Sequence, residues 1–181
     1  MKKSLVVFLI FVIPLLPGIV SAKTVLVLGD SLSAAYNMPI EQGWVHLLRL
    51  DLQARFNGEV KVVNASISGD TTSGGLMRLP AALEQHQPSI VILELGANDG
   101  LRGMSLAQMK RNLTKMIELS RDQDAKVLLA GMQLPPNYGA FFNNRFRKAF
   151  ADLADEQDVT LIPFFLEGVG GVRELRSEEH T

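Results

Sequence analysis

Residues 24–33 read TVLVLGDSLS. A short, nearly continuous apolar run is followed at once by glycine and small polar side chains. A run of this length, bounded by turn residues, is typical of a strand that is buried on both faces, as in a parallel sheet. The stretch therefore predicts a buried strand that ends in a polar loop starting at Gly29.

The same arrangement recurs along the chain and predicts an α/β fold. Strands are predicted at 24–28, 60–64, 90–94, 127–131 and 160–162. Apolar residues at helical spacing predict helices at 44–55, 71–83, 105–120 and 138–156. Alternating strands and helices are the signature of βαβ units, so we expect a parallel sheet covered on both faces. The 181 residues leave room for one domain.

Composition narrows the class of partner. The chain has 18 basic and 19 acidic residues and no basic block, so it has no strong field to attract nucleic acid or an anionic membrane surface. We expect a small-molecule partner and no nucleic acid. The absence of cysteine excludes disulfides, thiolate catalysis and cysteine-ligated zinc.

The first 22 residues predict a signal peptide. Lys2 and Lys3 form a charged start, residues 5–16 are apolar, and Ala22 closes a small-residue cleavage site. The alternative is an N-terminal membrane anchor, but the apolar stretch is shorter than the roughly 20 residues that a spanning helix needs. We expect cleavage after Ala22, a periplasmic or secreted location, and no stable membrane span after cleavage.

Three predicted loops combine glycine with short polar residues, at 29–33, 64–70 and 96–100. Each follows a predicted strand directly, so a parallel sheet places all three at the same edge. Ser, Asp and Asn also cap helices, and glycine permits tight turns, so each loop alone has a purely structural interpretation. The convergence of the three loops favours a functional site.

The residues of these loops suit acyl transfer. The hydroxyl of Ser31, just past a strand and near a helix N-terminus, would lie in a positive field that favours developing negative charge. Acyl transfer also needs fixed hydrogen-bond donors aimed at a tetrahedral oxyanion. The N–H groups of Ser31 and Gly69 and the side-chain amide of Asn98 could supply three such donors.

The loops resemble the conserved blocks of the SGNH, or GDSL, hydrolases. Residues 29–33 match the first block, Gly69 the glycine block and Asn98 the asparagine block. Residues 63–71, 78–81 and 133–139 are similar to one branch in particular, the periplasmic multifunctional acyl-CoA thioesterases, lysophospholipases and arylesterases. The resemblance spans about 24–167.

This resemblance implies a flavodoxin-like, three-layer α/β/α sandwich. It implies a serine hydrolase of acyl esters or thioesters that forms an acyl-enzyme on Ser31. The oxyanion hole would comprise Ser31, Gly69 and Asn98. No cofactor and no metal are implied.

The family's last block is an Asp-x-x-His motif, which supplies the general base and the carboxylate that orients it. His46, His86 and His180 all lack an aspartate at that offset. We therefore expect the catalytic Asp and His, and the last helix of the fold, to be absent from the printed sequence. Loss of the base from a serine triad costs up to about 10⁶ in turnover, so the chain should be nearly inert.

Residues 176–181 read RSEEHT, which is one reading frame of a common sequencing adaptor, AGATCGGAAGAGCACACG. We expect a hydrolase domain over 23–175, incomplete at its C-terminus, and an adaptor-derived tail over 176–181. The alternative is a genuine, divergent C-terminus of charged residues.

Two other functions stay open. A carbohydrate deacetylase of the same family would accept only acetyl groups; Leu76, Met77 and Leu79 favour a longer acyl chain, although core packing explains them equally well. A non-catalytic periplasmic ligand-binding domain would need no histidine, but such binders usually have two domains that close on a ligand.

Overall fold

The computed structural model describes residues 23–170. The predicted signal peptide (1–22) and the predicted adaptor-derived tail (176–181) lie outside the described residues, and so do residues 171–175.

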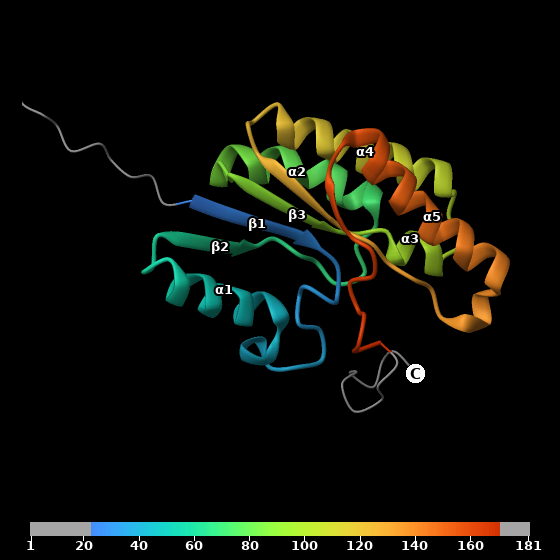
Figure 1. Cartoon of the computed structure of the whole chain (residues 1–181), viewed down its shortest axis with the longest axis horizontal. Helices are drawn as coiled ribbons and strands as arrows, with labels where there is room; N and C mark the ends of the chain where they lie inside the picture. Colours follow the sequence, from blue (N-terminus) through green and yellow to red (C-terminus); the bar gives the residue numbers. More distant parts are fainter. Residues whose placement is uncertain (1–22, 171–181) are drawn as a thin grey trace, which may run out of the picture.

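The centre of the fold is a parallel sheet of five strands in the order β2-β1-β3-β4-β5 (Figure 1). The strands are β1 (Lys23–Gly29), β2 (Val60–Asn64), β3 (Ile90–Glu94), β4 (Lys126–Ala130) and β5 (Thr160–Ile162). Val25 of β1 lies opposite Val62 of β2 on one side and Ile90 of β3 on the other. This strand order is that of the flavodoxin-like fold, so the predicted fold class is confirmed.

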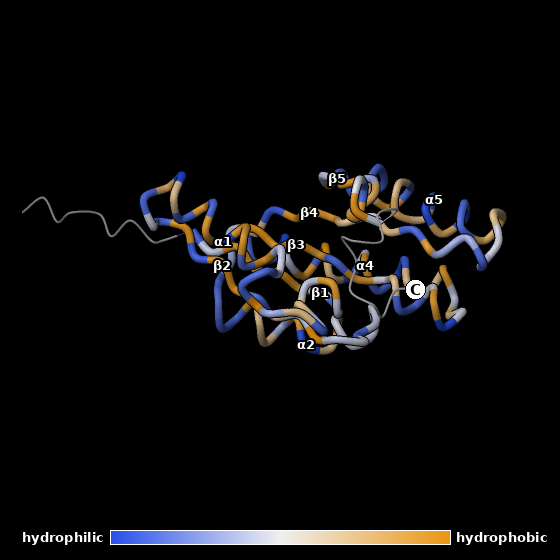
Figure 2. Tube along the Cα trace, turned by 90° about the horizontal axis from the view of Figure 1, so that it is seen from below, coloured by the Kyte–Doolittle hydropathy of each residue, from blue (hydrophilic) through white to orange (hydrophobic). Residues whose placement is uncertain are grey.

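Helices cover both faces of the sheet. Helix α1 (Trp44–Arg55) lies on one face, and α2 (Thr72–His86), α4 (Leu106–Arg121) and α5 (Ala140–Gln157) lie on the other (Figure 1). Successive residues of β1 alternate between the two cores, because side chains alternate across a strand. Val25 and Val27 pack in the core under α1, while Leu26 and Leu28 pack in the larger core under α2, α4 and α5. The buried strands therefore read as continuous apolar runs, as the hydropathy-coloured trace shows (Figure 2).

Several element boundaries agree with the sequence-based predictions. The strands at 60–64, 90–94 and 160–162 and the helix at 44–55 have the predicted bounds. The last long helix was predicted from residue 138 but begins at Ala140, because residues 136–138 form a separate 3-10 turn, η2 (Pro136–Tyr138), closed by Gly139 at φ 82°.

The prediction that residues 96–100 form a loop is wrong in part. Residues 97–100 belong to a short helix, α3 (Ala97–Leu101), which starts after Gly96 at φ 117°. A helix of one turn with a glycine inside it has too little periodicity to be seen in sequence. A second short element, the 3-10 helix η1 (Ile40–Gln42), precedes α1.

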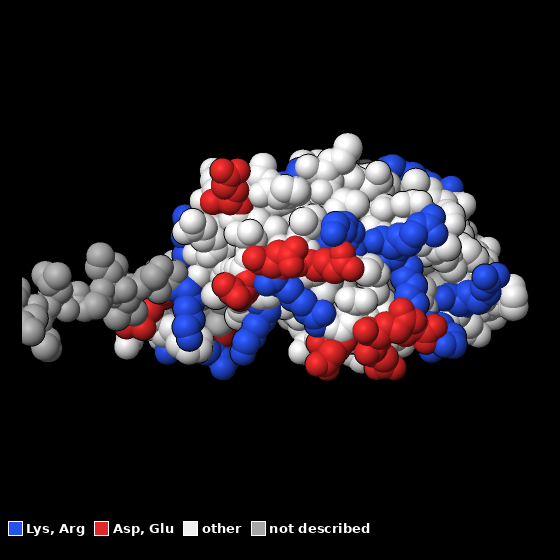
Figure 3. Space-filling view, turned by 90° about the horizontal axis from the view of Figure 1, so that it is seen from above, with Lys and Arg blue, Asp and Glu red and all other residues white. Residues whose placement is uncertain are grey.

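The surface over α4 and α5 carries charges of both signs. Lys110 pairs with Glu156, and Lys148 pairs with Asp152. In the view from above, basic and acidic side chains are interspersed (Figure 3). Over residues 23–170, none of the helices is both long enough and apolar enough to cross a membrane.

Candidate active site

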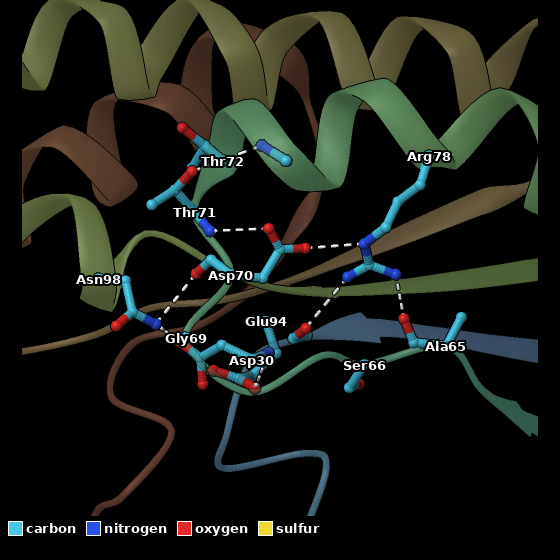
Figure 4. Close-up of polar contacts among 12 residues, drawn as sticks. Asp30, Ala65, Ser66, Gly69, Asp70, Thr71, Thr72, Arg78, Glu94 and Asn98 are labelled. Carbon is cyan, nitrogen blue, oxygen red and sulfur yellow. Dashed lines mark hydrogen bonds and ion pairs between the residues drawn. The ribbon is translucent and has the colours of Figure 1, made fainter.

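The three polar loops meet beyond the carboxyl ends of β1, β2 and β3, where the strand order reverses (Figure 4). The Ile67 N–H donates to the Gly29 carbonyl at 3.1 Å, which joins the second loop to the first. The Asn98 side-chain amide donates to Asp30 Oδ2 at 3.0 Å and to the Asp70 carbonyl at 2.9 Å, which joins the third loop to both. The predicted convergence is therefore confirmed. In open α/β sheets, a crevice at this reversal of strand order is where ligands bind.

Ser31 lies in a tight turn that directly follows β1. The Tyr36 N–H donates to the Ser31 carbonyl at 3.1 Å, and the Ala34 N–H donates to the Asp30 carbonyl at 2.9 Å. Asp30 is 1% exposed, and its Oδ1 accepts the Leu32 N–H at 3.1 Å. These hydrogen bonds hold the turn. Ser31 itself is half-buried, so it is accessible to a substrate.

A helix N-terminus lies beside this turn, but it is not that of the next helix along the chain. Helix α1 begins only at Trp44, whereas Asn98, in the first turn of α3, contacts Asp30. The positive field expected at Ser31 would therefore come from α3. This helix has five residues, so its contribution is small.

Gly69 occupies a backbone conformation that favours glycine, with φ 76°. Its carbonyl accepts a hydrogen bond from Arg102 at 2.8 Å. Among residues 23–170, no acceptor is paired with the N–H of Gly69 or with the N–H of Ser31. These two predicted donors are therefore available to a ligand, whereas both hydrogens of the Asn98 amide already have acceptors.

Arg78 of α2 is a site residue that sequence reasoning missed. Its Nε donates to Asp70 Oδ2 at 2.7 Å, and its other two nitrogens donate to the carbonyls of Ala65 and Gly29 (Figure 4). One guanidinium thus holds the loop that carries Gly69 against the end of β1. The only signal in the sequence was its place in the 78–81 stretch, which supported the resemblance but indicated no role for the arginine.

A buried polar network under the second and third loops was also missed. Asp99, 2% exposed, accepts the Thr72 N–H at 2.9 Å and the Thr72 hydroxyl at 2.6 Å. The Asn112 amide of α4 donates to the Thr72 hydroxyl oxygen at 3.0 Å. This network ties the first turns of α2 and α3 to each other and to α4. It fixes Asn98, the residue before Asp99, relative to the loop that precedes Thr72.

Glu94 is a further residue that sequence reasoning missed. It is the last residue of β3 and is fully buried, although its sequence position at the end of an apolar run gave no sign of a special role. Its Oε2 accepts the Ser33 hydroxyl at 2.6 Å and the Asp30 N–H at 3.3 Å. Burial, and secondarily the nearby charge of Asp30, raise the pKa of Glu94 well above its usual value.

Neither described histidine is placed to serve Ser31. His46 lies on α1 and forms a hydrogen bond with Arg49 at 2.8 Å. His86 is the last residue of α2, a helix of 15 residues whose first turn lies at the site. Because such a helix is roughly 20 Å long, His86 is far from the loops. His180 lies outside the described residues. Within residues 23–170, no cluster of three or more potential metal ligands is present.

Comparisons with known proteins agree with this fold and identify the family. A family model described as the GDSL-like Lipase/Acylhydrolase family matches residues 27–179. The chain is 52% identical over 153 residues to the esterase TesA of Pseudomonas aeruginosa, covering 84% of this chain and 76% of that protein. It is 46% identical over 149 residues to an Escherichia coli K12 protein named thioesterase 1/protease 1/lysophospholipase L1, covering 82% and 70%. The crystal structure of TesA superposes with a TM-score of 0.84 at 50% identity and covers 87% of each chain.

Proposed function

The chain belongs to the GDSL-like lipase/acylhydrolase family, and from this membership we propose that it is a serine hydrolase that cleaves acyl esters and thioesters through an acyl-enzyme on Ser31. The observation that carries the proposal is the meeting of Ser31, Gly69 and Asn98 at one edge of the sheet, with the Ser31 and Gly69 N–H groups unpaired within residues 23–170. The names of the relatives, an esterase and a thioesterase 1/protease 1/lysophospholipase L1, support this substrate class.

In the proposed mechanism, the Ser31 oxygen attacks the acyl carbonyl while a general base accepts the hydroxyl proton. The carbonyl oxygen becomes an oxyanion held by the N–H groups of Ser31 and Gly69 and by the Asn98 amide. A substrate oxyanion would take the place of Asp30 as one acceptor of that amide, while Asp30 keeps the Leu32 N–H. The base then protonates the leaving alcohol or thiol, and water releases the acyl group. Each oxyanion donor is worth about 2.7–4 kcal/mol of barrier.

We propose that the general base comes from outside residues 23–170, as the Asp-x-x-His block of the family implies. The printed sequence carries no such block. The chain should therefore react slowly with acyl substrates unless a general base is supplied. The proposed hydrolase domain is 23–175, and the proposed signal peptide over 1–22 would direct it to the periplasm or outside the cell.

The acyl-chain preference needs a direct test, because the apolar residues near the loops divide between the core and the surface. Leu79 is fully buried in the core, whereas Met77 is 79% exposed. A series of p-nitrophenyl esters from acetyl to palmitoyl separates the functions. Hydrolysis of medium and long chains supports the esterase/thioesterase proposal, and activity on acetyl esters alone would instead indicate a deacetylase.

The nucleophile is tested by labelling with a fluorophosphonate, with Ser31→Ala as the matched control. We expect slow labelling of Ser31 that rises with added imidazole, which replaces the missing base, and no labelling of S31A. A chimera carrying the C-terminal segment of TesA beyond residue 167 should label quickly without imidazole. Failure of that chimera to label at Ser31, or saturable ester binding without turnover, would contradict the proposal and favour a ligand-binding domain.

A further inference from the structure

The turn that carries Ser31 is held from below by a carboxyl group that the proposed mechanism does not use. Glu94 lies opposite Gly29 in the register of β3 and β1 and is completely buried. Its side chain reaches the residues on both sides of Ser31. Oε2 accepts the Asp30 N–H at 3.3 Å and the Ser33 hydroxyl at 2.6 Å. The Oε2 atom of Glu94 thus accepts hydrogen bonds from one residue before Ser31 and from one residue after it.

The space for this contact exists because residue 29 has no side chain. A Cβ at Gly29 would lie 2.5 Å from Ser33 Oγ and 2.6 Å from Glu94 Oε2, well inside van der Waals contact. Both of these atoms are buried, so neither can move into solvent. Gly29 is therefore required because any side chain there would clash with the Glu94 carboxyl group, and not only because it lies next to a turn.

The protonated form of Glu94 suits this place. Its Oε1 is buried and has no hydrogen-bond partner among residues 23–170. An ionised carboxylate would leave a charged oxygen unsolvated, which is costly. The raised pKa of Glu94 favours the neutral acid instead. A neutral acid also adds no negative charge beneath the place where an oxyanion would form.

We propose that Glu94 is a positioning residue that fixes the Ser31 turn through its contacts with the Asp30 N–H and the Ser33 hydroxyl. The proposal rests on Ser31 as the nucleophile for its functional consequence. It predicts that removing the carboxyl loosens the turn and slows the reaction of Ser31 without weakening the binding of the reagent. Glutamine, which presents the same oxygen on the same stem, should replace Glu94.

The first readout is amide hydrogen exchange, which does not depend on activity. In Glu94→Ala we expect exchange about tenfold faster at Asp30, Ala34 and Tyr36, as the loss of a hydrogen bond of about 1.4 kcal/mol implies. Glu94→Gln should stay within about threefold of the parent, given one retained acceptor. Unchanged exchange at these amides in E94A, or exchange in E94Q as fast as in E94A, would overturn the proposal.

The second readout is fluorophosphonate labelling with imidazole present, separated into reagent affinity and maximal rate. E94A should lower the maximal rate about tenfold at unchanged affinity, and E94Q should restore it. Leu153→Ala is the control, since it opens a cavity in the α5 core away from the turn and should leave the rate unchanged. Equal slowing by L153A would show that lost stability alone is responsible and would overturn the proposal.

The two readouts separate the inference from the proposed function. If the chimera with the C-terminal segment of TesA is never labelled at Ser31, the proposed function fails, while hydrogen exchange still decides the role of Glu94. If E94A does not fold, Ser33→Ala removes one of the two contacts and should speed exchange at Ala34 by about threefold. Exchange in S33A at the parent rate would then count against the proposal.

Discussion

Replacing Arg78 by methionine should destabilise the domain by removing the contacts that tie the second loop to β1. The guanidinium donates to Asp70 Oδ2 at 2.7 Å and to two backbone carbonyls, those of Ala65 and Gly29. The side chains of Arg78 and Asp70 are 23% and 13% exposed, so water screens the ion pair only in part. Methionine keeps much of the apolar stem and deletes the charge and the donors.

The contacts of Arg78 set the size of the expected loss. The charged hydrogen bond to Asp70 contributes about 1.5–3 kcal/mol. The Ala65 carbonyl loses its guanidinium donor, which costs about 1 kcal/mol for a partly buried acceptor. The Gly29 carbonyl keeps the Ile67 N–H at 3.1 Å and so loses little. The sum is about 2.5–4 kcal/mol, which lowers Tm by about 5 to 15 °C in a domain of this size.

Urea and thermal unfolding of R78M, R78K and the parent provide the assay. Arg78→Lys keeps a positive charge near Asp70 but lacks the planar guanidinium that reaches both carbonyls. R78K should therefore lose about half of the unfolding free energy that R78M loses. Arg55 and Asp51 form a matched control pair at 2.8 Å, with side chains 69% and 50% exposed. R55M should therefore cost less than about 0.5 kcal/mol.

Two results would refute this reasoning. The first is a loss of less than about 1 kcal/mol in R78M, below the lower bound for a charged hydrogen bond. The second is an equal loss in R78M and R55M, because it would mean that partial burial adds nothing. A double-mutant cycle with Asp70→Asn isolates the pair, and its coupling energy should account for more than half of the R78M loss.

Three further predictions concern buried groups. Because burial and Asp30 raise the pKa of Glu94, the folded chain holds a proton that the unfolded chain has lost above about pH 4.3. Stability should therefore fall as pH rises from there until the folded-state pKa is passed, and E94Q should abolish that dependence in urea unfolding. Phe150→Ala should cost about 3–5 kcal/mol in the same assay, since Phe150 is 1% exposed and stacks edge-on against Phe146. Thr72→Val should cost about 1–3 kcal/mol, because it leaves Asp99 without its hydroxyl donor; thermal unfolding close to that of the parent would contradict this.

The sheet was predictable because buried parallel strands carry a strong local signal. The apolar run at 90–94 has the same bounds in the structure as in the prediction, and its burial on both faces explains why it lacks alternation. The one-turn helix α3 was not predictable, since its five residues, Ala97–Leu101, include a glycine and show no period. Local sequence patterns thus identify those helices and strands that are long enough for the pattern to repeat.

The candidate site was predictable in outline for a related reason. Ser31, Gly69 and Asn98 all lie just past a strand, and parallel topology brings such positions together. The residues that hold them were not predictable. Glu94 meets Ser33, and Thr72 meets Asp99, across long stretches of chain. A sequence shows that a glutamate ends an apolar run, but it does not show which hydroxyl lies opposite.

The three candidate site residues share an arrangement that follows from these contacts. Each has an aspartate next to it in the chain, and that aspartate makes the anchoring bonds. Asp30 accepts the Leu32 N–H and the Asn98 amide, Asp70 accepts Thr71 and Arg78, and Asp99 accepts both donors of Thr72.

Because the aspartates make these bonds, the N–H groups of Ser31 and Gly69 need no partner to hold their loops in place. A donor that already serves the fold would have to break that bond before it could stabilise an oxyanion, and that cost would subtract from catalysis. Anchoring through the neighbouring aspartate therefore lets the same loops be rigid and still present free donors. Asn98 is the exception. Its amide donates hydrogen bonds to Asp30 and to the Asp70 carbonyl. To stabilise an oxyanion, the Asn98 amide must therefore give up one of these structural hydrogen bonds, unlike the other two candidate donors.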